Sequence, residues 1–328
     1  MQTIPFTFRA VAEQSPGAKW QALFAGAWPA YRSWFLQEGD GARPSYVKGR
    51  LMLERHMPEL LPTYERLVDL AGGGDLSARL LTLYNPPPYL AGCSQGVIVR
   101  DEPVLVRNYD YAPARLEGVV LDSAWNGRRV IGMSDCLWGL LDGMNDAGLA
   151  VSLTFGGRRV LGSGFGIPLV VRYLLETCTT VAGCVAALAR LPSNLAHNLT
   201  LVDATGAALT AQVAPDRRPV YDPCPIATNH QTAVDWPEHA RLTRTVEREQ
   251  RLVALRADPA VTPERFVEAF FEPPLYSNAY SRGFGTLYTA VYRPASGRVD
   301  YLWPGGALHE SFAAFHEGIH TEPLQDAA

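Results

Sequence analysis

From residue 93 onward the chain repeats one pattern: a β-rich apolar run, a short turn and a second β-rich run. The first two runs cover residues 93–100 and 103–109. The same pattern surrounds turns at 145–148, 203–206 and 294–297, each ending in glycine, the residue that accepts a positive φ at least cost. Repeated hairpins predict antiparallel sheets and disfavour a regular strand–helix–strand repeat.

Helical periodicity marks the segments between these hairpins. The pattern predicts helices at 167–177, 180–190, 239–255 and 263–271, with Thr180 as an N-cap. The chain should therefore be an α+β protein in which helices cover antiparallel sheets.

The first 84 residues read as helical and precede the hairpins. Trp20, Phe24 and Trp28 recur at four-residue spacing and form one apolar stripe, which we interpret mainly as packing against the rest of the protein. Pro29 is expected to kink or split that helix. Further helices are predicted at 51–56, 58–70 and 75–83.

Composition limits the classes of partner. The chain has 328 residues, 47% of them hydrophobic, and a net charge of −4, so nothing favours nucleic acid or an anionic membrane as a partner. No run reaches the roughly 18 apolar residues of a membrane span, and the N-terminus does not read as a signal peptide.

Five cysteines and seven histidines show no zinc-ligand spacing, so we predict no metal and no cofactor. An odd number of cysteines without a C-x-x-C pair fits a reducing compartment, and we expect a cytoplasmic location. Four of the cysteines read as core or helix-face residues: Cys136, Cys178, Cys184 and Cys224.

Three polar clusters need an explanation beyond packing. The first is Gly92-Cys93-Ser94, which follows three prolines and opens a buried strand. The second runs from Arg107 to Tyr111, at the end of the neighbouring strand, where buried charges are costly unless they are paired or used. The third combines Asn229, at the end of a short strand, with Arg241 at the start of a helix.

These clusters occur in a fixed order: a strand-opening cysteine, then "VRNYDY", "LLDGMNDAGLAVSLTF", "NLTLVDATG", "ATNH" and "HARLTR". In this the chain resembles the N-terminal-nucleophile (Ntn) cysteine hydrolases over about residues 45–305. It is most similar to the branch of acyl-coenzyme A:isopenicillin N acyltransferase, and more distantly to choloylglycine hydrolases and penicillin V acylases. In the acyltransferase branch a helical segment precedes a Gly-Cys bond and stays bound after self-cleavage.

The resemblance implies a four-layer αββα Ntn-hydrolase sandwich in one compact domain. Residues 1–92 would be a helical pro-segment, which becomes the α chain, and residues 93–328 the catalytic core, or β chain. Cys93 would attack the carbonyl of Gly92, and water would then release the two chains. The α-amino group of Cys93 would act as general base, since such groups titrate near neutral pH.

Site roles also follow from the resemblance. Asp110 would orient the new amine, Arg107 would favour the thiolate, and Arg241 would brace the site. Asn229 would donate to the oxyanion. The second oxyanion position, an asparagine in the bile-salt branch, is Thr154 here, and its hydroxyl or a backbone N–H could serve.

The implied substrate is a small acyl amide, and the N-terminal fragment would be a retained partner chain. Water as acceptor gives an amidase, whereas an amine acceptor, with an acyl-CoA among the candidate donors, gives an acyltransferase. The sequence leaves that choice and the oligomeric state open. Aromatic residues of the N-terminal segment suggest an apolar acyl pocket: Trp20, Trp28, Trp34 and Phe35.

Two other functions stay open at this point. An uncleaved, non-catalytic scaffold could act as a binding protein, or Cys93 and His230 could form a conventional thiol-hydrolase dyad. Arg107 and Asp110 could equally be a structural ion pair. Asn145 reads as a turn residue, and the glycine-rich stretch 162–166 as a flexible loop rather than a phosphate-binding loop.

Overall fold

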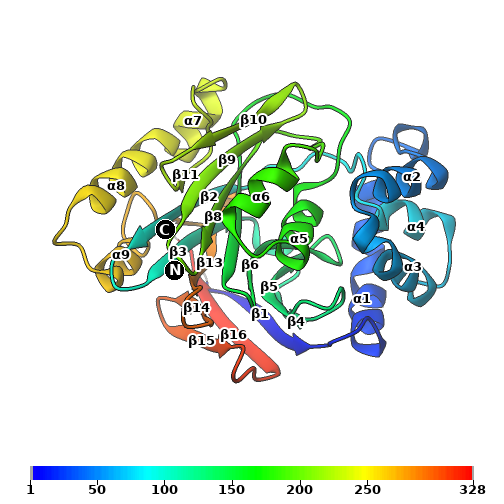
Figure 1. The fold of residues 1–328 in the computed structure, drawn as a ribbon, viewed down its shortest axis with the longest axis horizontal. Coiled ribbons are helices and arrows are strands. Elements are labelled where there is room, and N and C mark those ends of the chain that lie inside the picture. Colours follow the sequence, from blue (N-terminus) through cyan, green and yellow to red (C-terminus); the bar gives the residue numbers. More distant parts are fainter. Residues whose placement is uncertain (1–2, 327–328) are drawn as a thin grey trace.

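The computed structural model describes residues 3–326, which form two stacked β-sheets with helices on their outer faces (Figure 1). The larger sheet has nine strands in the order β10-β9-β8-β7-β6-β5-β4-β1-β16. Its strands are β1 (Thr3–Ala12), β4 (Val119–Ser123), β5 (Val130–Asp135), β6 (Gly139–Asn145), β7 (Leu149–Phe155), β8 (His197–Asp203), β9 (Ala208–Ala214), β10 (Arg217–Asp222) and β16 (Gly318–Gln325). Neighbouring strands are antiparallel except β1 and β4, which run parallel.

The smaller sheet has seven strands and is antiparallel throughout, in the order β11-β2-β3-β13-β14-β15, with β12 paired to β13. Its strands are β2 (Gly92–Val99), β3 (Pro103–Tyr111), β11 (Ile226–Ala227), β12 (Asn278–Ala279), β13 (Phe284–Arg293), β14 (Arg298–Trp303) and β15 (Gly306–Ser311). The hairpins expected around 101–102, 145–148, 203–206 and 294–297 are confirmed as β2–β3, β6–β7, β8–β9 and β13–β14.

Helices complete the four layers. On the nine-stranded sheet lie α5 (Ile167–Thr177) and α6 (Val181–Leu188). On the other sheet α8 (Thr245–Ala257) and α9 (Pro263–Ala269) pack against β2, and α7 (Pro237–Thr243) precedes them. The predicted α+β fold class, an αββα sandwich, is therefore confirmed.

Side-chain alternation along β2 decides what faces the space between the sheets. Gln95 points toward the larger sheet, where its amide nitrogen donates to Thr200 Oγ1 (2.8 Å) and its oxygen accepts from Ser152 Oγ (2.7 Å). Because side chains two residues apart share a face of a strand, Cys93 also points between the sheets.

The N-terminal helices stand together beside the sandwich, at the end away from α7–α9 (Figure 1). They are α1 (Ala18–Phe35), α2 (Tyr46–His56), α3 (Leu61–Leu70) and α4 (Asp75–Leu81). On α1 the predicted stripe is confirmed as packing, because Trp20 and Phe24 are buried in the core and Trp28 packs against it. Pro29 lies inside α1 without dividing it, so the expected split is wrong.

The helical reading of the first 84 residues is also wrong for residues 3–12, which form β1. Ile4, Phe6, Phe8 and Ala10 alternate with exposed residues, and this period of two is that of a strand. Phe8 is fully buried beneath Trp303, with 4.5 Å between the ring centroids. The N-terminal segment is thus part of the main sheet as well as a helical cluster.

Two helix predictions illustrate a confirmed and a corrected boundary. Thr180 caps α6, because its hydroxyl accepts from the Gly183 N–H (3.2 Å). The single helix expected over 239–255 is divided into α7 and α8 at Arg244, which has a φ of +50°. Since a left-handed residue ends a helix, the direction of the chain changes there.

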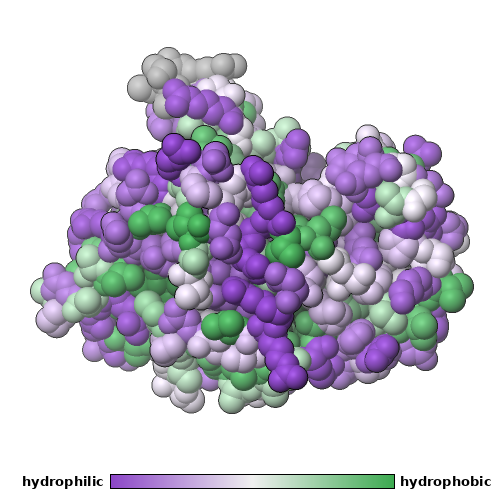
Figure 2. All heavy atoms as spheres, turned by 90° about the horizontal axis from the view of Figure 1, so that it is seen from above, coloured by the Kyte–Doolittle hydropathy of each residue, from purple (hydrophilic) through white to green (hydrophobic). Residues whose placement is uncertain are grey.

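The face shown in Figure 2 is mostly hydrophilic, with separate hydrophobic patches. Within residues 3–326 no helix combines the length and the apolar character needed to cross a membrane.

Candidate active site

Cys93 lies in the centre of the molecule, near the start of β2. Its side chain is completely buried, and its sulfur accepts a hydrogen bond from Arg107 Nη2 at 3.4 Å. Burial raises the pKa of the Cys93 thiol, and the positive charge of Arg107 opposes that rise. The sulfur is therefore held as a thiol beside a permanent cation.

Arg107 is paired with Asp142 of β6 rather than with Asp110. Its Nη1 forms a buried ion pair with the Asp142 carboxylate and donates to Tyr288 Oη (3.0 Å), which itself donates to Asp142 (2.6 Å). This corrects the alternative in which Arg107 and Asp110 form a structural ion pair. The two residues are three positions apart on β3, so their side chains point to opposite faces of the sheet.

Asp110 faces the helical layer and pairs with Arg248 of α8. Its carboxylate accepts from Thr286 Oγ1 (2.7 Å) and lies 3.2 Å from Arg248 Nη1. Burial raises the pKa of Asp110, and Arg248 opposes the rise. Asp110 is also the register partner of Gly92 across the β2–β3 ladder. The carboxylate is thus placed beside the predicted cleavage bond, on the opposite face of the sheet from the thiol.

Asn229 is held next to the backbone nitrogen of Cys93. Its Oδ1 accepts from that N–H (3.0 Å) and from Arg248 Nη2 (2.6 Å). Its Nδ2 donates to the carbonyl oxygens of Ala91 and Phe155, both at 3.2 Å. Two donors on one side and two acceptors on the other fix the orientation of the amide.

Arg248, which the sequence reasoning did not single out, is a second arginine in the site beside Arg107. Its Nη1 donates to the Cys93 carbonyl (2.8 Å) as well as reaching Asp110. The expectation that Arg241 braces the site is wrong. Arg241 lies on the exposed side of α7, and among the described residues it donates only to Pro237 O, within its own helix. The sequence did contain a signal for Arg248. This arginine lies on the apolar face that Leu252 and Leu255 form on α8, where a charge is costly unless it has a partner.

Thr154 is buried behind Asn229, and its hydroxyl is already engaged. It donates to Thr228 O (2.7 Å) and accepts from Asn198 Nδ2 (3.1 Å). A hydroxyl has one proton, so Thr154 has none free for an oxyanion. The structure places Thr154 as a support for the loop that carries Asn229.

Gly92 has no space for a side chain. A Cβ at this position would lie 2.3 Å from Phe284 Cε1 and 3.2 Å from Asp110 Cβ. The 2.3 Å contact is far below van der Waals separation, so a side chain at this position would require the Phe284 ring to move.

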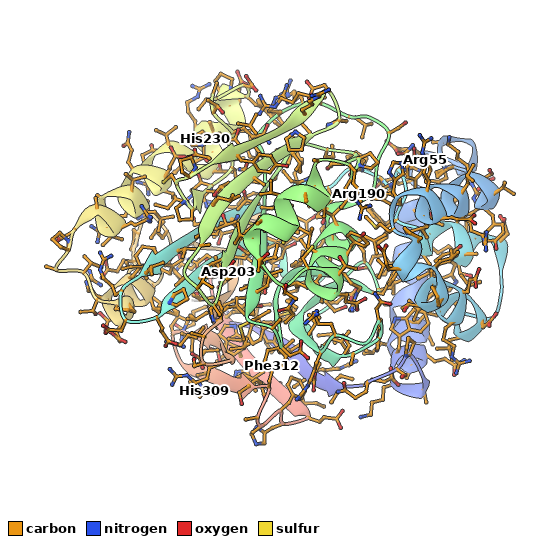
Figure 3. All side chains as sticks on the ribbon, viewed as in Figure 1. Arg55, Arg190, Asp203, His230, His309 and Phe312 are labelled. Carbon is orange, nitrogen blue, oxygen red and sulfur yellow. The ribbon has the colours of Figure 1, made fainter. Side chains whose placement is uncertain are left out.

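His230 does not form a dyad with Cys93. Its ring nitrogens contact Thr245 Oγ1 (2.9 Å) and Glu249 Oε2 (3.1 Å), both on α8. The adjacent Asn229 side chain points toward Cys93, and His230 lies at the periphery near α7 (Figure 3). The conventional Cys-His interpretation is therefore not supported.

A cavity of about 650 Å³ lies away from these residues, at the other end of the smaller sheet. Arg100, Arg298 and His309 line it, and His309 is far from His230 in Figure 3. None of the predicted site residues contributes to it.

The αββα sandwich of antiparallel sheets, with the thiol of Cys93 on an inner strand, is the fold of the Ntn hydrolases. The family model described as acyl-coenzyme A:6-aminopenicillanic acid acyl-transferase matches residues 99–307. The chain belongs to that family and is an Ntn-type acyltransferase or acyl-amide hydrolase. The matched region includes Arg107, Asp110 and Asn229 but begins after Cys93.

Solved structures give more distant matches. A mutant conjugated bile acid hydrolase from Clostridium perfringens is 13% identical, with 72% of this chain and 97% of the other covered and a TM-score of 0.44. Penicillin V acylase from Agrobacterium tumefaciens is 14% identical (67% and 86% covered, TM-score 0.47). The Caenorhabditis elegans orthologue of N-acylethanolamine-hydrolyzing acid amidase is 16% identical (62% and 93% covered, TM-score 0.43). A search of curated proteins found no match.

Proposed function

We propose that the chain is a self-processing cysteine amidase or acyltransferase that cuts its own Gly92–Cys93 bond and then carries acyl groups on Cys93. The observation that carries this proposal is that two side chains hold Cys93 by hydrogen bonds. Asn229 Oδ1 accepts from its backbone N–H (3.0 Å), and Arg107 Nη2 donates to its sulfur (3.4 Å). A residue that only packs in the core needs neither contact.

Self-cleavage begins when the Cys93 sulfur attacks the Gly92 carbonyl carbon. The new C–S bond replaces the C–N bond, and the proton lost by the thiol passes to the departing nitrogen, which becomes an α-amine. Water then hydrolyses the thioester, which returns the thiol and leaves Gly92 as a carboxylic acid. No cofactor is required for either step.

After cleavage the nucleophile and the base belong to one residue. An α-amino group ordinarily has a pKa of about 7.7–8.0, so the amine of Cys93 can accept the proton of its own thiol near neutral pH. Asn229 Oδ1 already holds that nitrogen, and the Asp110–Arg248 pair lies next to it. In this proposal Asp110 and Arg248 position the amine, while Arg107 stabilises the thiolate.

Asn229 Nδ2 is proposed as an oxyanion donor during acyl transfer. In the uncut chain this N–H₂ group donates to Ala91 O, one residue before the cleavage site. Movement of the new C-terminus after cleavage would release that donor for a substrate oxyanion. Losing a donor of this kind typically costs about 100- to 1000-fold in rate. Thr154 is not proposed as the second donor.

The N-terminal fragment is proposed to stay bound as a partner chain. Strand β1 lies between β4 and β16 in the nine-stranded sheet. From the core side, Arg190 Nη1 donates to the carbonyl of His56 on α2 (2.7 Å), and Figure 3 shows Arg190 reaching toward the N-terminal helices. Residues 1–92 and 93–328 would thus remain one compact unit after cleavage.

The acyl donor is proposed to be a small amide or an acyl-CoA, with water or an amine as acceptor. The matching family is named for acyl-coenzyme A and 6-aminopenicillanic acid, which supports an acyl-CoA as donor and an amine as acceptor. Five free cysteines support the cytoplasm as the compartment.

The intact masses of purified wild type, Cys93→Ala and Cys224→Ala test this proposal. Wild type and Cys224→Ala should each yield fragments 1–92 and 93–328, whereas Cys93→Ala should remain one chain. Cys224 is the matched control because it is a cysteine outside the site. A wild-type chain that stays intact, with no hydroxylamine-released Gly92 hydroxamate, would refute self-cleavage.

A further inference from the structure

Two cysteines meet where α5 ends and α6 begins, on the outer face of the nine-stranded sheet. Cys178 caps the C-terminus of α5, and Cys184 lies in the first turn of α6. The Cys184 thiol donates a hydrogen bond to the Cys178 sulfur, and both cysteines are free. A Cβ on Gly183 would lie 3.6 Å from Cys178 Cβ and 3.9 Å from Cys178 Sγ, so the first turn of α6 packs on this side chain. The two sulfurs are therefore neighbours that no covalent bond joins.

Solvent reaches the two thiols unequally. Cys178 lines a cavity of about 340 Å³, together with Thr177, Thr180 and Arg190. Cys184 is not among the lining residues and is completely buried, whereas Cys178 is 8% exposed. A small dissolved oxidant therefore meets Cys178 first, and Cys184 lies behind it.

The surroundings of Cys178 favour its thiolate. The hydrogen bond from Cys184 lowers the pKa of Cys178, and burial opposes that shift. The hydroxyl of Thr177, 3.8 Å from the Cys178 sulfur, and the positive charge of Arg190 lower this pKa further. The same hydrogen bond raises the pKa of Cys184, so the pair keeps one proton on the inner sulfur.

The remaining thiols of the chain are less ready to react. Burial raises the pKa of Cys93, Cys136 and Cys224. The thiolate is the form that reacts with oxidants and electrophiles. Before any self-cleavage, Cys178 should therefore be the first of the five cysteines to be modified.

Backbone contacts keep the two cysteines in place. Asn145 Nδ2 donates to the carbonyl of Cys178 (2.8 Å), which ties the end of α5 to β6. The N–H of Cys184 donates to Thr180 O (3.1 Å) within the first turn of α6. Because both backbones are held, an oxidised Cys178 sulfur would stay beside Cys184.

We propose that Cys178 and Cys184 form a peroxide-sensitive dithiol, in which Cys178 is oxidised first and Cys184 then closes a reversible disulfide. The dithiol is separate from Cys93, which lies between the two sheets. The inference does not rest on the proposed self-cleavage or acyl transfer.

Two steps form the disulfide. The Cys178 thiolate attacks one oxygen of hydrogen peroxide, an S–O bond replaces the O–O bond, and the departing hydroxide takes up a proton as water. The Cys184 sulfur then attacks the Cys178 sulfur, an S–S bond replaces the S–O bond, and the thiol proton leaves with the hydroxyl group as water. One peroxide is reduced for each disulfide formed, and a thiol reductant restores the pair.

Peptide mapping after brief treatment with hydrogen peroxide tests the dithiol. Wild type and full-length Cys93→Ala are treated, and free thiols are then blocked with N-ethylmaleimide. The second protein makes the result independent of self-cleavage. A Cys178–Cys184 disulfide should form in both proteins and disappear with dithiothreitol.

Single variants separate the roles of the two sulfurs. Cys184→Ser should stop at a Cys178 sulfenic acid, which dimedone captures, whereas Cys178→Ser should leave Cys184 reduced. Cys136→Ala removes a buried cysteine outside the pair and is the matched control, in which the disulfide should form as in wild type.

Alkylation of the wild-type chain needs no variant. At pH 7 iodoacetamide should label Cys178 about 10-fold faster than Cys224, although Cys224 is the more exposed, because more of Cys178 is thiolate. Slower labelling of Cys178 than of Cys224 would overturn the proposal. Peroxide products that lack the Cys178–Cys184 bond would overturn it as well.

Discussion

At the scale of single residues, the close packing of Phe284 on Gly92 restricts which residue can precede the proposed cleavage bond. The Phe284 ring occupies the position that a Cβ on residue 92 would need, at 2.3 Å. A glycine at position 92 has two separate physical reasons: the Phe284 ring excludes a side chain, and glycine leaves the backbone free to adopt a strained conformation. A variant that changes both Gly92 and Phe284 distinguishes the two reasons.

Gly92→Ala should slow self-cleavage by about 10- to 100-fold, because overpacking of about 1–3 kcal/mol displaces the strand that carries the bond. Gly92→Ala combined with Phe284→Ala should recover most of the rate, since the ring is gone. The measurement is the fraction of cleaved chain against time by mass spectrometry, with Phe284→Ala alone as control. No recovery in the double variant would show that the requirement for glycine is not steric.

Asp135, at the end of β5, is a buried carboxyl group near Glu117 without a basic ion-pair partner in residues 3–326. It is 6% exposed, and burial together with the charge of Glu117 raises the pKa of Asp135 to about 8. Between about pH 4 and pH 8 the folded chain therefore keeps a proton that the unfolded chain has lost. Stability must fall as pH rises through this window.

Asp135→Asn, made in uncleaved Cys93→Ala chain, should become increasingly more stable than its parent from pH 4 to pH 8, by about 2–5 kcal/mol at the upper end. Asparagine mimics the protonated acid and does not titrate. Urea unfolding at several pH values measures the difference, and exposed Asp101→Asn is the control. A stability difference that does not change with pH would contradict this account of Asp135.

Residue roles were predictable from the sequence only where a motif identified them. Cys93 and Asn229 lie together as the order of motifs predicted. The partners of Arg107 and Asp110 were not predictable, because Asp142 and Arg248 come from other layers of the fold. One sequence has no signal for which buried charges meet across two sheets.

At the scale of elements, β1 links the two proposed chains. It pairs with β16 from Thr3↔Gln325 to Ala10↔Gly318 and with β4 on its other side. Among the described residues β16 is the edge strand of its sheet, and β1 is the strand with which it pairs. Release of residues 1–92 would open the sheet on both sides of β1.

Phe8→Ala should weaken retention of the N-terminal fragment, because it removes a fully buried ring, at a cost of about 3–5 kcal/mol. After cleavage, the urea concentration at which fragment 1–92 separates from 93–328 in size-exclusion chromatography should fall. Exposed Thr7→Ala on the same strand is the control. Equal separation points for both variants would show that β1 does not hold the fragment.

Hairpins were the elements that the sequence predicted best, because their turns carry a local chemical signature. The turn at 145–148 is an example: Gly148 has a φ of +80°, and Asn145 Oδ1 accepts from the N–H of Leu149 (2.9 Å). Strand β1 was missed because helical periodicity dominates the residues after it. The break at Arg244 was missed because no glycine or proline marks it.

At the scale of the whole molecule, the order of motifs was sufficient to predict the αββα class, because that order carries the resemblance to the Ntn hydrolases. The position of the N-terminal segment was not predictable, because it depends on pairing between residues more than 300 positions apart. The completed fold surrounds Cys93 with groups from both sheets and from α8. These groups can position the thiol and the α-amine of Cys93 together, as the proposed catalysis by this residue requires.

The most direct test of this account is the mass of the acyl-enzyme. Wild-type protein is mixed with an N-acyl substrate, quenched during turnover and examined as intact chains and as peptides. The account predicts that fragment 93–328 gains one acyl group, that the group is on the N-terminal Cys93, and that hydroxylamine removes it. Turnover with the acyl group on another residue, or on a chain still joined at Gly92–Cys93, would contradict the central claim.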